Sequence, residues 1–138
     1  MAKSKIVLPN DIERIPELSE FIETFCDQQM VDISLAMSVN LALEEAVVNV
    51  MTYAYPEGVV GEVTVEAMAE DNCLTFTLID SGTPFDPTAQ AEVDTTLSAE
   101  ERPIGGLGIH LVRQIMDDVQ YQYKDGQNIL TLTKKFNS

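Results

Sequence analysis

Apolar residues at helical spacing predict a helix near the start of the chain. Four of them lie three or four positions apart, as residues on one helix face do: Ile15, Leu18, Ile22 and Phe25. We expect this helix to begin at Asn10 or Asp11, either of which can cap it, and to run to about residue 29. The segment before it, residues 5–9, predicts a short strand.

A second helix is predicted over about 32–54, with Asp32 as its cap and with Pro56 and Gly58 beyond its end. Its apolar residues cover nearly the whole circumference, so most of its surface should be buried. Three polar residues nevertheless lie in the middle of it: Glu44, Glu45 and Asn49. These polar side chains need a reason to be there, because burying them without partners costs free energy.

Alternating apolar and polar residues predict four more strands, at 61–69, 72–80, 119–123 and 128–135. Turns are expected at Asp71-Asn72 and at 124–126, a polar loop at 81–104, and a helix from near Gly108 to about Asp118. The order β-α-α-β-β-loop-α-β-β predicts an α+β fold, with residues 1–138 as a single domain. We expect a two-layer α/β sandwich, a mostly antiparallel sheet covered on one face by helices.

Composition narrows the classes of function. The formal net charge is −15, so the surface should repel nucleic acid phosphates, and no nucleic acid partner is expected. No apolar run approaches the length of a membrane span, and no signal peptide precedes Pro9, so no membrane association is expected. Two cysteines and one histidine make no plausible zinc site, which favours a reduced, cytoplasmic protein.

Glu45 and Asn49 are four residues apart, so they share one face of the predicted second helix. Their spacing alone favours a tertiary hydrogen bond to a neighbouring loop over a ligand site. Asp80 gives a stronger indication of a ligand site. It lies at every second position after Leu74, Phe76 and Leu78, so its side chain should share their face of the strand and point at the helix layer. Gly82 then permits a close backbone approach or a positive φ, although an ordinary turn at the end of a strand is the alternative.

A glycine-rich stretch, Gly105-Gly106-Leu107-Gly108, opens the predicted third helix. Free amides at a helix N-terminus can bind anions, whereas the alternative is a flexible entry to a packed helix. The stretch fits neither a P-loop nor a dinucleotide fingerprint. His110, in the first turn, is expected at the surface and is not assigned a catalytic role.

The three groups of polar residues make sense together if a polar ligand lies between the buried helix and the sheet. An asparagine carbonyl is a hard oxygen ligand that suits Mg²⁺. A carboxylate that only accepts hydrogen bonds suits an exocyclic amine such as that of adenine.

These motifs, in this order, resemble those of the GHKL (Bergerat-fold) ATPases, which include histidine-kinase catalytic domains. The segments "LALEEAVVNVMTYAYPEG", "LIDSGTPFDP" and "GGLGIHLVRQIMDDVQY" resemble the stand-alone bacterial anti-sigma-factor serine/threonine kinases more closely. The resemblance covers nearly the whole chain. It implies a histidine-kinase-like ATPase fold with ATP and Mg²⁺ as cofactors.

By this resemblance each motif position acquires an expected role. Asn49 would coordinate Mg²⁺ and Glu45 would be the general base. Asp80 would accept a hydrogen bond from the adenine amine, with Gly82 beside the ring. Residues 84–104 would form a lid over the nucleotide. The amides that would contact the phosphates belong to Gly105, Gly106, Leu107 and Gly108.

The resemblance implies a kinase that phosphorylates an antagonist protein and switches between this antagonist and a sigma factor. The alternative is a non-catalytic switch in which nucleotide only sets partner affinity. Relatives are often homodimers, so a homodimer is a further expectation. One departure concerns the last strand, where many relatives have Gly-Thr-Thr with a threonine that holds adenine. This chain has Gly126-Gln127-Asn128 instead.

Overall fold

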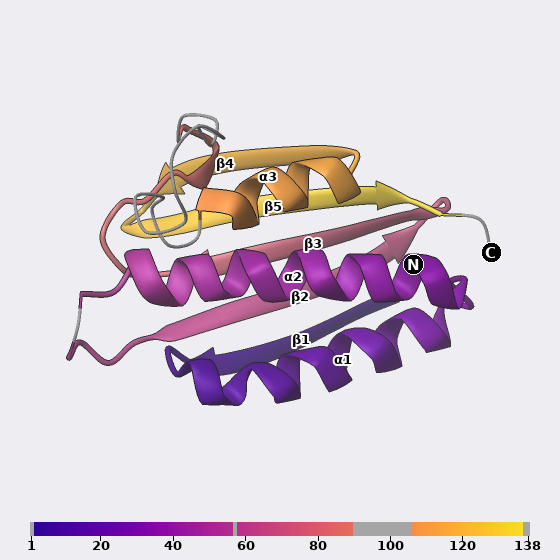
Figure 1. The fold of residues 1–138 in the computed structure, drawn as a ribbon, viewed down its shortest axis with the longest axis horizontal. Helices are drawn as coiled ribbons and strands as arrows, with labels where there is room; N and C mark the ends of the chain where they lie inside the picture. Colours follow the sequence, from indigo (N-terminus) through magenta and orange to yellow (C-terminus); the bar gives the residue numbers. More distant parts are fainter. Residues whose placement is uncertain (1, 57, 90–105, 137–138) are drawn as a thin grey trace.

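The computed structural model describes residues 2–56, 58–89 and 106–136, in which five strands form one sheet (Figure 1). The strands are β1 (Ala2–Pro9), β2 (Glu62–Glu70), β3 (Cys73–Asp80), β4 (Asp118–Lys124) and β5 (Gln127–Lys135). They lie in the order β1-β2-β3-β5-β4, and each neighbouring pair is antiparallel. The predicted antiparallel sheet is confirmed.

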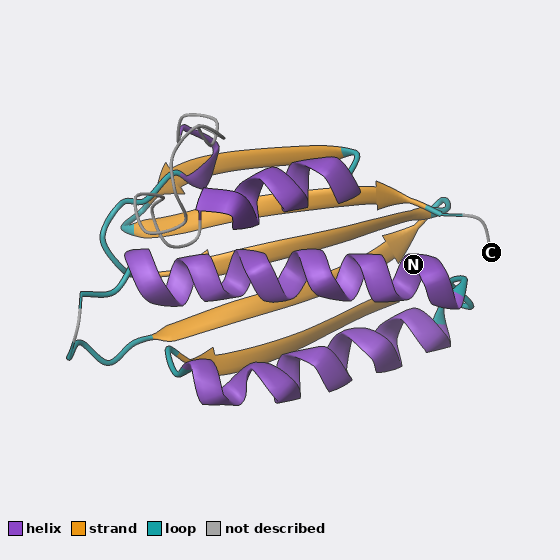
Figure 2. Cartoon of the chain, in the orientation of Figure 1, coloured by secondary structure: helices purple, strands orange, loops and turns teal. Residues whose placement is uncertain are grey.

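The α-helices of the described residues cover the same face of this sheet (Figure 2). They are α1 (Ile15–Gln28), α2 (Ile33–Tyr53) and α3 (Gly106–Ile115), and α2 lies between the other two (Figure 1). Asp32 caps α2 by accepting a hydrogen bond from the Ser34 N–H. Asp11 caps a short 3₁₀ helix, Ile12–Arg14, that leads into α1. The predicted two-layer sandwich, with helices on one face, is therefore confirmed.

Several predicted boundaries are wrong by a few residues. β1 begins at Ala2 rather than at residue 5, because residues 2–5 pair with residues 66–69 of β2. α3 begins at Gly106 rather than near Gly108. It ends at Ile115 rather than at about Asp118, because Asp118 pairs with Thr133 in the sheet.

The hairpin turns have the conformation that two-residue hairpin loops require. Both turn residues between β2 and β3 have positive φ, 51° at Asp71 and 61° at Asn72. The turn between β4 and β5 has φ of 54° at Asp125 and 78° at Gly126. Such turns match the twist of the flanking strands, so the short polar sequences at these positions set the strand register.

α2 provides much of the core between the sheet and the other helices. By length and mean hydropathy it could cross a membrane, contrary to the expectation that no apolar run approaches that length. In the fold it is a core helix, since its apolar residues are buried on several sides: Val39, Ala42, Leu43, Ala46, Val47, Val50 and Met51. A helix that is apolar all round is buried in a domain core as readily as in lipid.

Candidate nucleotide site

Asp80 is a buried carboxylate at the end of β3. Its side chain is 3% exposed, and the residues of the same parity, Leu74, Phe76 and Leu78, are buried with it, as the alternation predicted. It accepts hydrogen bonds on Oδ1 from the Gly82 N–H (2.9 Å) and from Asn128 Nδ2 (2.9 Å). Burial raises the pKa of Asp80, and these two hydrogen bonds act in the opposite direction. Asp80 therefore points at the helix layer, as its parity predicted, and its bond from the Gly82 N–H shows that it also forms the expected turn at the end of the strand.

Asn128, expected only as a departure from the Gly-Thr-Thr of many relatives, is the partner of Asp80, a role that the sequence did not predict. It lies directly opposite Asp80 in the sheet and is 4% exposed. Its Nδ2 donates to Asp80 Oδ1 and to the Thr83 carbonyl (2.9 Å each), and its Oδ1 accepts from the Phe85 N–H (2.9 Å) and the Tyr121 hydroxyl. These bonds use the whole capacity of the amide. Asn128 thus holds Asp80 and the following loop in place. Asn128 alternates with Leu130 and Leu132 along the strand, and this spacing could have predicted that its side chain faces the helices.

Gly82 is needed for a close approach between the loop after β3 and the end of α2. A Cβ at position 82 would lie 2.2 Å from the carbonyl oxygen of Ala54. The same oxygen accepts hydrogen bonds from the Thr83 N–H (2.7 Å) and hydroxyl (3.0 Å). Of the two explanations for this glycine, close approach is correct. The contact fixes residues 81–85 against the C-terminal end of α2.

Tyr53, the last residue of α2, and Tyr55, just beyond the helix, add further contacts to this loop. The Tyr55 hydroxyl donates to the Glu62 carbonyl (2.7 Å) and accepts from the Ser81 N–H (3.1 Å). The ring of Tyr53 packs against Phe85 with centroids 5.3 Å apart. The last turn of α2 and the end of β3 are therefore one connected unit.

Asn49 and Glu45 lie in the C-terminal half of α2, near this unit. Asn49 is 4% exposed and Glu45 is half-buried. Within the described ranges, neither side chain has a hydrogen bond or an ion pair with another residue. The tertiary hydrogen bond that the spacing favoured is thus not found among the described residues. A buried amide with no partner in the described ranges is a candidate for ligand binding.

The glycine-rich stretch lies partly outside the described residues. Gly105 and most of the predicted lid, residues 90–104, fall there, so their assignment stays a prediction. Gly106, Leu107 and Gly108 form the first turn of α3, which starts at the same end of the molecule as the C-terminus of α2 (Figure 1). His110 is exposed, and its Nε2 lies 3.2 Å from Gln114 Nε2. The expectation that it is a surface residue is confirmed.

We expect replacement of Asn128 with alanine to lower the free energy of unfolding by about 3 kcal/mol. The substitution would leave the buried Asp80 carboxylate and the Thr83 and Phe85 backbone groups without their partner, at a cost of about 1–3 kcal/mol per unpaired group. Urea unfolding at pH 7 measures the change. Gln127→Ala removes an exposed amide one residue away and should change stability by less than about 0.5 kcal/mol. Equal effects of the two substitutions would contradict the role assigned to Asn128.

The arrangement can hold a ligand that carries both a hydrogen-bond donor and negative charge. Asp80 presents a buried acceptor, Asn49 a buried amide oxygen, and the first turn of α3 presents helix N-terminal amides. Groups of three or more metal-ligating side chains (His, Cys, Asp or Glu) do not occur in the described part of the chain. This donor set fits Mg²⁺, which is usually held by one or two protein oxygens together with substrate phosphates.

Proteins of similar sequence are bacterial serine-protein kinases. A protein of Listeria monocytogenes serovar 1/2a named serine-protein kinase RsbW is 36% identical over 101 residues, which cover 70% of this chain and 64% of that protein. The protein of the same name from Bacillus cereus is 31% identical over 94 residues, covering 65% of this chain and 58% of its own length. The match thus spans less than two-thirds of these relatives.

Solved structures share the fold. A Mycobacterium tuberculosis protein with RsbU and RsbW domains superposes on 99% of this chain with a TM-score of 0.71 and 17% identity, over 33% of its own length. The catalytic domain of the histidine kinase ThkA superposes with a TM-score of 0.56 and 11% identity, over 99% of this chain and 98% of that domain. Residues 8–134 also match the sequence model of the histidine kinase-like ATPase domain. The chain therefore belongs to the histidine kinase-like ATPase family.

Proposed function

We propose that this chain is an ATP-dependent protein serine/threonine kinase of the anti-sigma-factor type. The observation that carries the proposal is the buried Asp80 carboxylate, held by Asn128 beside the end of α2. Membership of an ATPase family and the kinase names of the matching relatives support it. In this proposal the protein acts in the cytoplasm, phosphorylates an antagonist protein and alternates between that antagonist and a sigma factor.

Asp80 recognises the adenine base in this proposal. Both of its hydrogen bonds within the described residues are accepted by Oδ1, which leaves Oδ2 to accept from an exocyclic amine. Asn128 takes no direct part in base binding, because its amide is fully used. Asn128 instead positions the Asp80 carboxylate, and it lies where this chain has Gly-Gln-Asn in place of the Gly-Thr-Thr of many relatives. Gly82 lies beside the ring, where a side chain would collide with Ala54.

The phosphates are held by residues from two helices. Asn49 would supply an oxygen ligand for Mg²⁺, and the ion would supply charge neutralisation at the phosphates. The backbone amides of Gly106, Leu107 and Gly108 at the start of α3, together with that of the preceding Gly105, would donate to the phosphate oxygens. Glu45 lies one helical turn from Asn49 on the same face and accepts the proton of the incoming serine or threonine hydroxyl.

We expect the protein to bind ATP at least tenfold more tightly than GTP, because guanine presents a carbonyl oxygen to Asp80 where adenine presents an amine. One hydrogen bond to a charged group contributes about 1.5–3 kcal/mol, which corresponds to tenfold or more. Calorimetry with non-hydrolysable analogues of both nucleotides in the presence of Mg²⁺ measures the difference. Asp80→Asn should weaken ATP binding and reduce the preference. Equal affinities of the parent protein for the two analogues would refute the assignment.

A further inference from the structure

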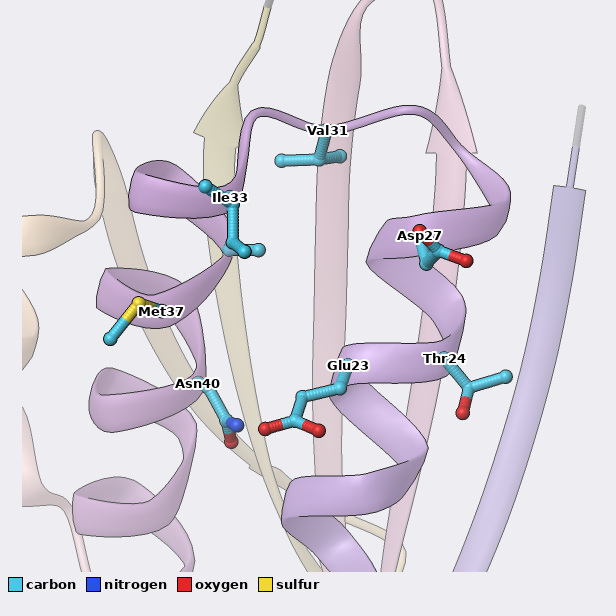
Figure 3. Close-up of a pocket in the computed structure, with 8 residues that line it drawn as sticks. Glu23, Thr24, Asp27, Val31, Ile33, Met37 and Asn40 are labelled. Carbon is cyan, nitrogen blue, oxygen red and sulfur yellow. The ribbon is translucent and has the colours of Figure 1, made fainter.

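A groove lies between the C-terminal half of α1 and the first turns of α2 (Figure 3). Its volume is about 570 Å³, and Glu23 and Asp27 from α1 and Ile33, Met37 and Asn40 from α2 are among the residues that line it. We call it the α1–α2 groove. Asn40 is nine residues before Asn49, which is about 14 Å along the helix at 1.5 Å per residue. The groove is therefore separate from the candidate nucleotide site.

Asn40 lines this groove, and its buried side-chain oxygen has no hydrogen-bond partner among the described residues. The side chain is 8% exposed, and its Nδ2 donates to the Ser19 hydroxyl (2.9 Å) and the Ser19 carbonyl (3.4 Å). The Ser19 carbonyl can only accept, which sets the amide nitrogen on that side. Oδ1 is the buried side-chain atom that lacks a partner among the described residues. An unsatisfied buried acceptor destabilises the fold, so a bound donor that reaches this oxygen would remove that cost.

The rest of the groove combines negative charge with apolar surface. Glu23 and Asp27 are exposed and form no ion pair with any described residue, and the Glu23 carboxylate points toward Asn40 (Figure 3). Ile33 is 75% exposed and Met37 is 69% exposed. A lysine or arginine side chain matches both features, because it carries only donors on its charged head and an apolar stem behind it.

We propose that the α1–α2 groove binds a basic amphipathic segment of a partner protein. A lysine or arginine of that segment donates to Asn40 Oδ1 between Glu23 and Asp27, and its apolar neighbours cover Ile33 and Met37. A second copy of this chain is a poor occupant, since it would bring its own acidic groove and a net charge of −15 against the first. The inference goes beyond the proposed kinase activity and does not depend on nucleotide binding.

The test uses a synthetic fluorescent 14-residue helical peptide with one leucine-rich face that carries a central arginine. Fluorescence anisotropy at 0.15 M salt measures its affinity, and a peptide with glutamine in place of the arginine is the control ligand. We expect the arginine peptide to bind at least tenfold more tightly than the glutamine peptide. Amide chemical-shift changes should cluster at residues 23–40. Absence of binding at 1 mM, or shift changes centred on the sheet, would overturn the proposal.

Two variants that each lose two negative charges distinguish binding in the groove from general attraction of a basic peptide to an acidic protein. Glu23→Gln with Asp27→Asn should weaken binding of the arginine peptide at least tenfold. Glu66→Gln with Glu70→Gln removes the same charge from exposed positions of β2 and should weaken it less than twofold. Equal losses would show that only net charge matters and would overturn the proposal.

Sedimentation of the parent protein and of Ile33→Ser with Met37→Ser tests the competing occupant. The two side chains are exposed, so the substitutions should not affect folding. We expect unchanged association and at least tenfold weaker peptide binding. Conversion of a dimer to a monomer would identify this face as a self-interface and overturn the proposal.

Discussion

Replacing Asn49 with alanine is expected to abolish Mg²⁺-dependent ATP binding, and phosphate transfer with it. The Asn49 amide is 4% exposed and has no hydrogen-bond partner in the described part of the chain, so its substitution removes the proposed oxygen ligand without breaking a hydrogen bond to a described residue. Calorimetry of ATP-analogue binding, with and without Mg²⁺, measures the effect.

A control substitution on the same helix makes this result interpretable. Thr52 is an exposed polar residue near the end of α2, and Thr52→Ala should bind nucleotide as the parent does. Urea unfolding should show that Asn49→Ala is folded, since no hydrogen bond to a described residue is lost. Retained Mg²⁺-dependent binding in a folded Asn49→Ala variant would remove Asn49 from the candidate site.

Replacing Glu45 with alanine is expected to preserve nucleotide affinity within about threefold and to slow phosphate transfer by roughly 10²-fold or more, the scale of general-base removal. Phosphoryl transfer depends mainly on positioning and charge neutralisation, with one residue to orient or deprotonate the nucleophile. Glu45 is half-buried and has no partner among the described residues, so it is available for this role. Radiolabelled ATP and a co-purified antagonist protein provide the assay.

Glu44 is the matched control, because it is the adjacent carboxylate, is also half-buried and does not share the face of Asn49. Glu44→Gln should transfer phosphate at close to the parent rate. If Glu45→Ala transfers as fast as the parent, Glu45 is structural and the assignment of the base is wrong. A parent protein that binds ATP but labels no partner would instead be a non-catalytic switch.

Local sequence patterns were sufficient for the fold and for part of the site. Helical and alternating periodicity predicted the element order and the two-layer arrangement, because burial of one face imposes these periods on any sequence. Parity alone placed Asp80 toward the helix layer, as found. The errors lie at the element ends. β1 begins earlier than predicted because residues 2–5 pair with β2, and α3 ends earlier because Asp118 pairs with Thr133 in the sheet.

Tertiary contacts decided what local patterns could not. Asn128 is 48 residues from Asp80, and only the register of β3 and β5 makes it the partner of that carboxylate. The need for glycine at position 82 comes from the Ala54 carbonyl on another element. The environment of Asn40, whose oxygen has no partner among the described residues, likewise depends on how α1 packs on α2. The sequence by itself determined periodicity, charge and the order of motifs, because these are local properties. Hydrogen-bond partners and close approaches were decided by the tertiary structure, since they join residues whose separation in the chain carries no pattern.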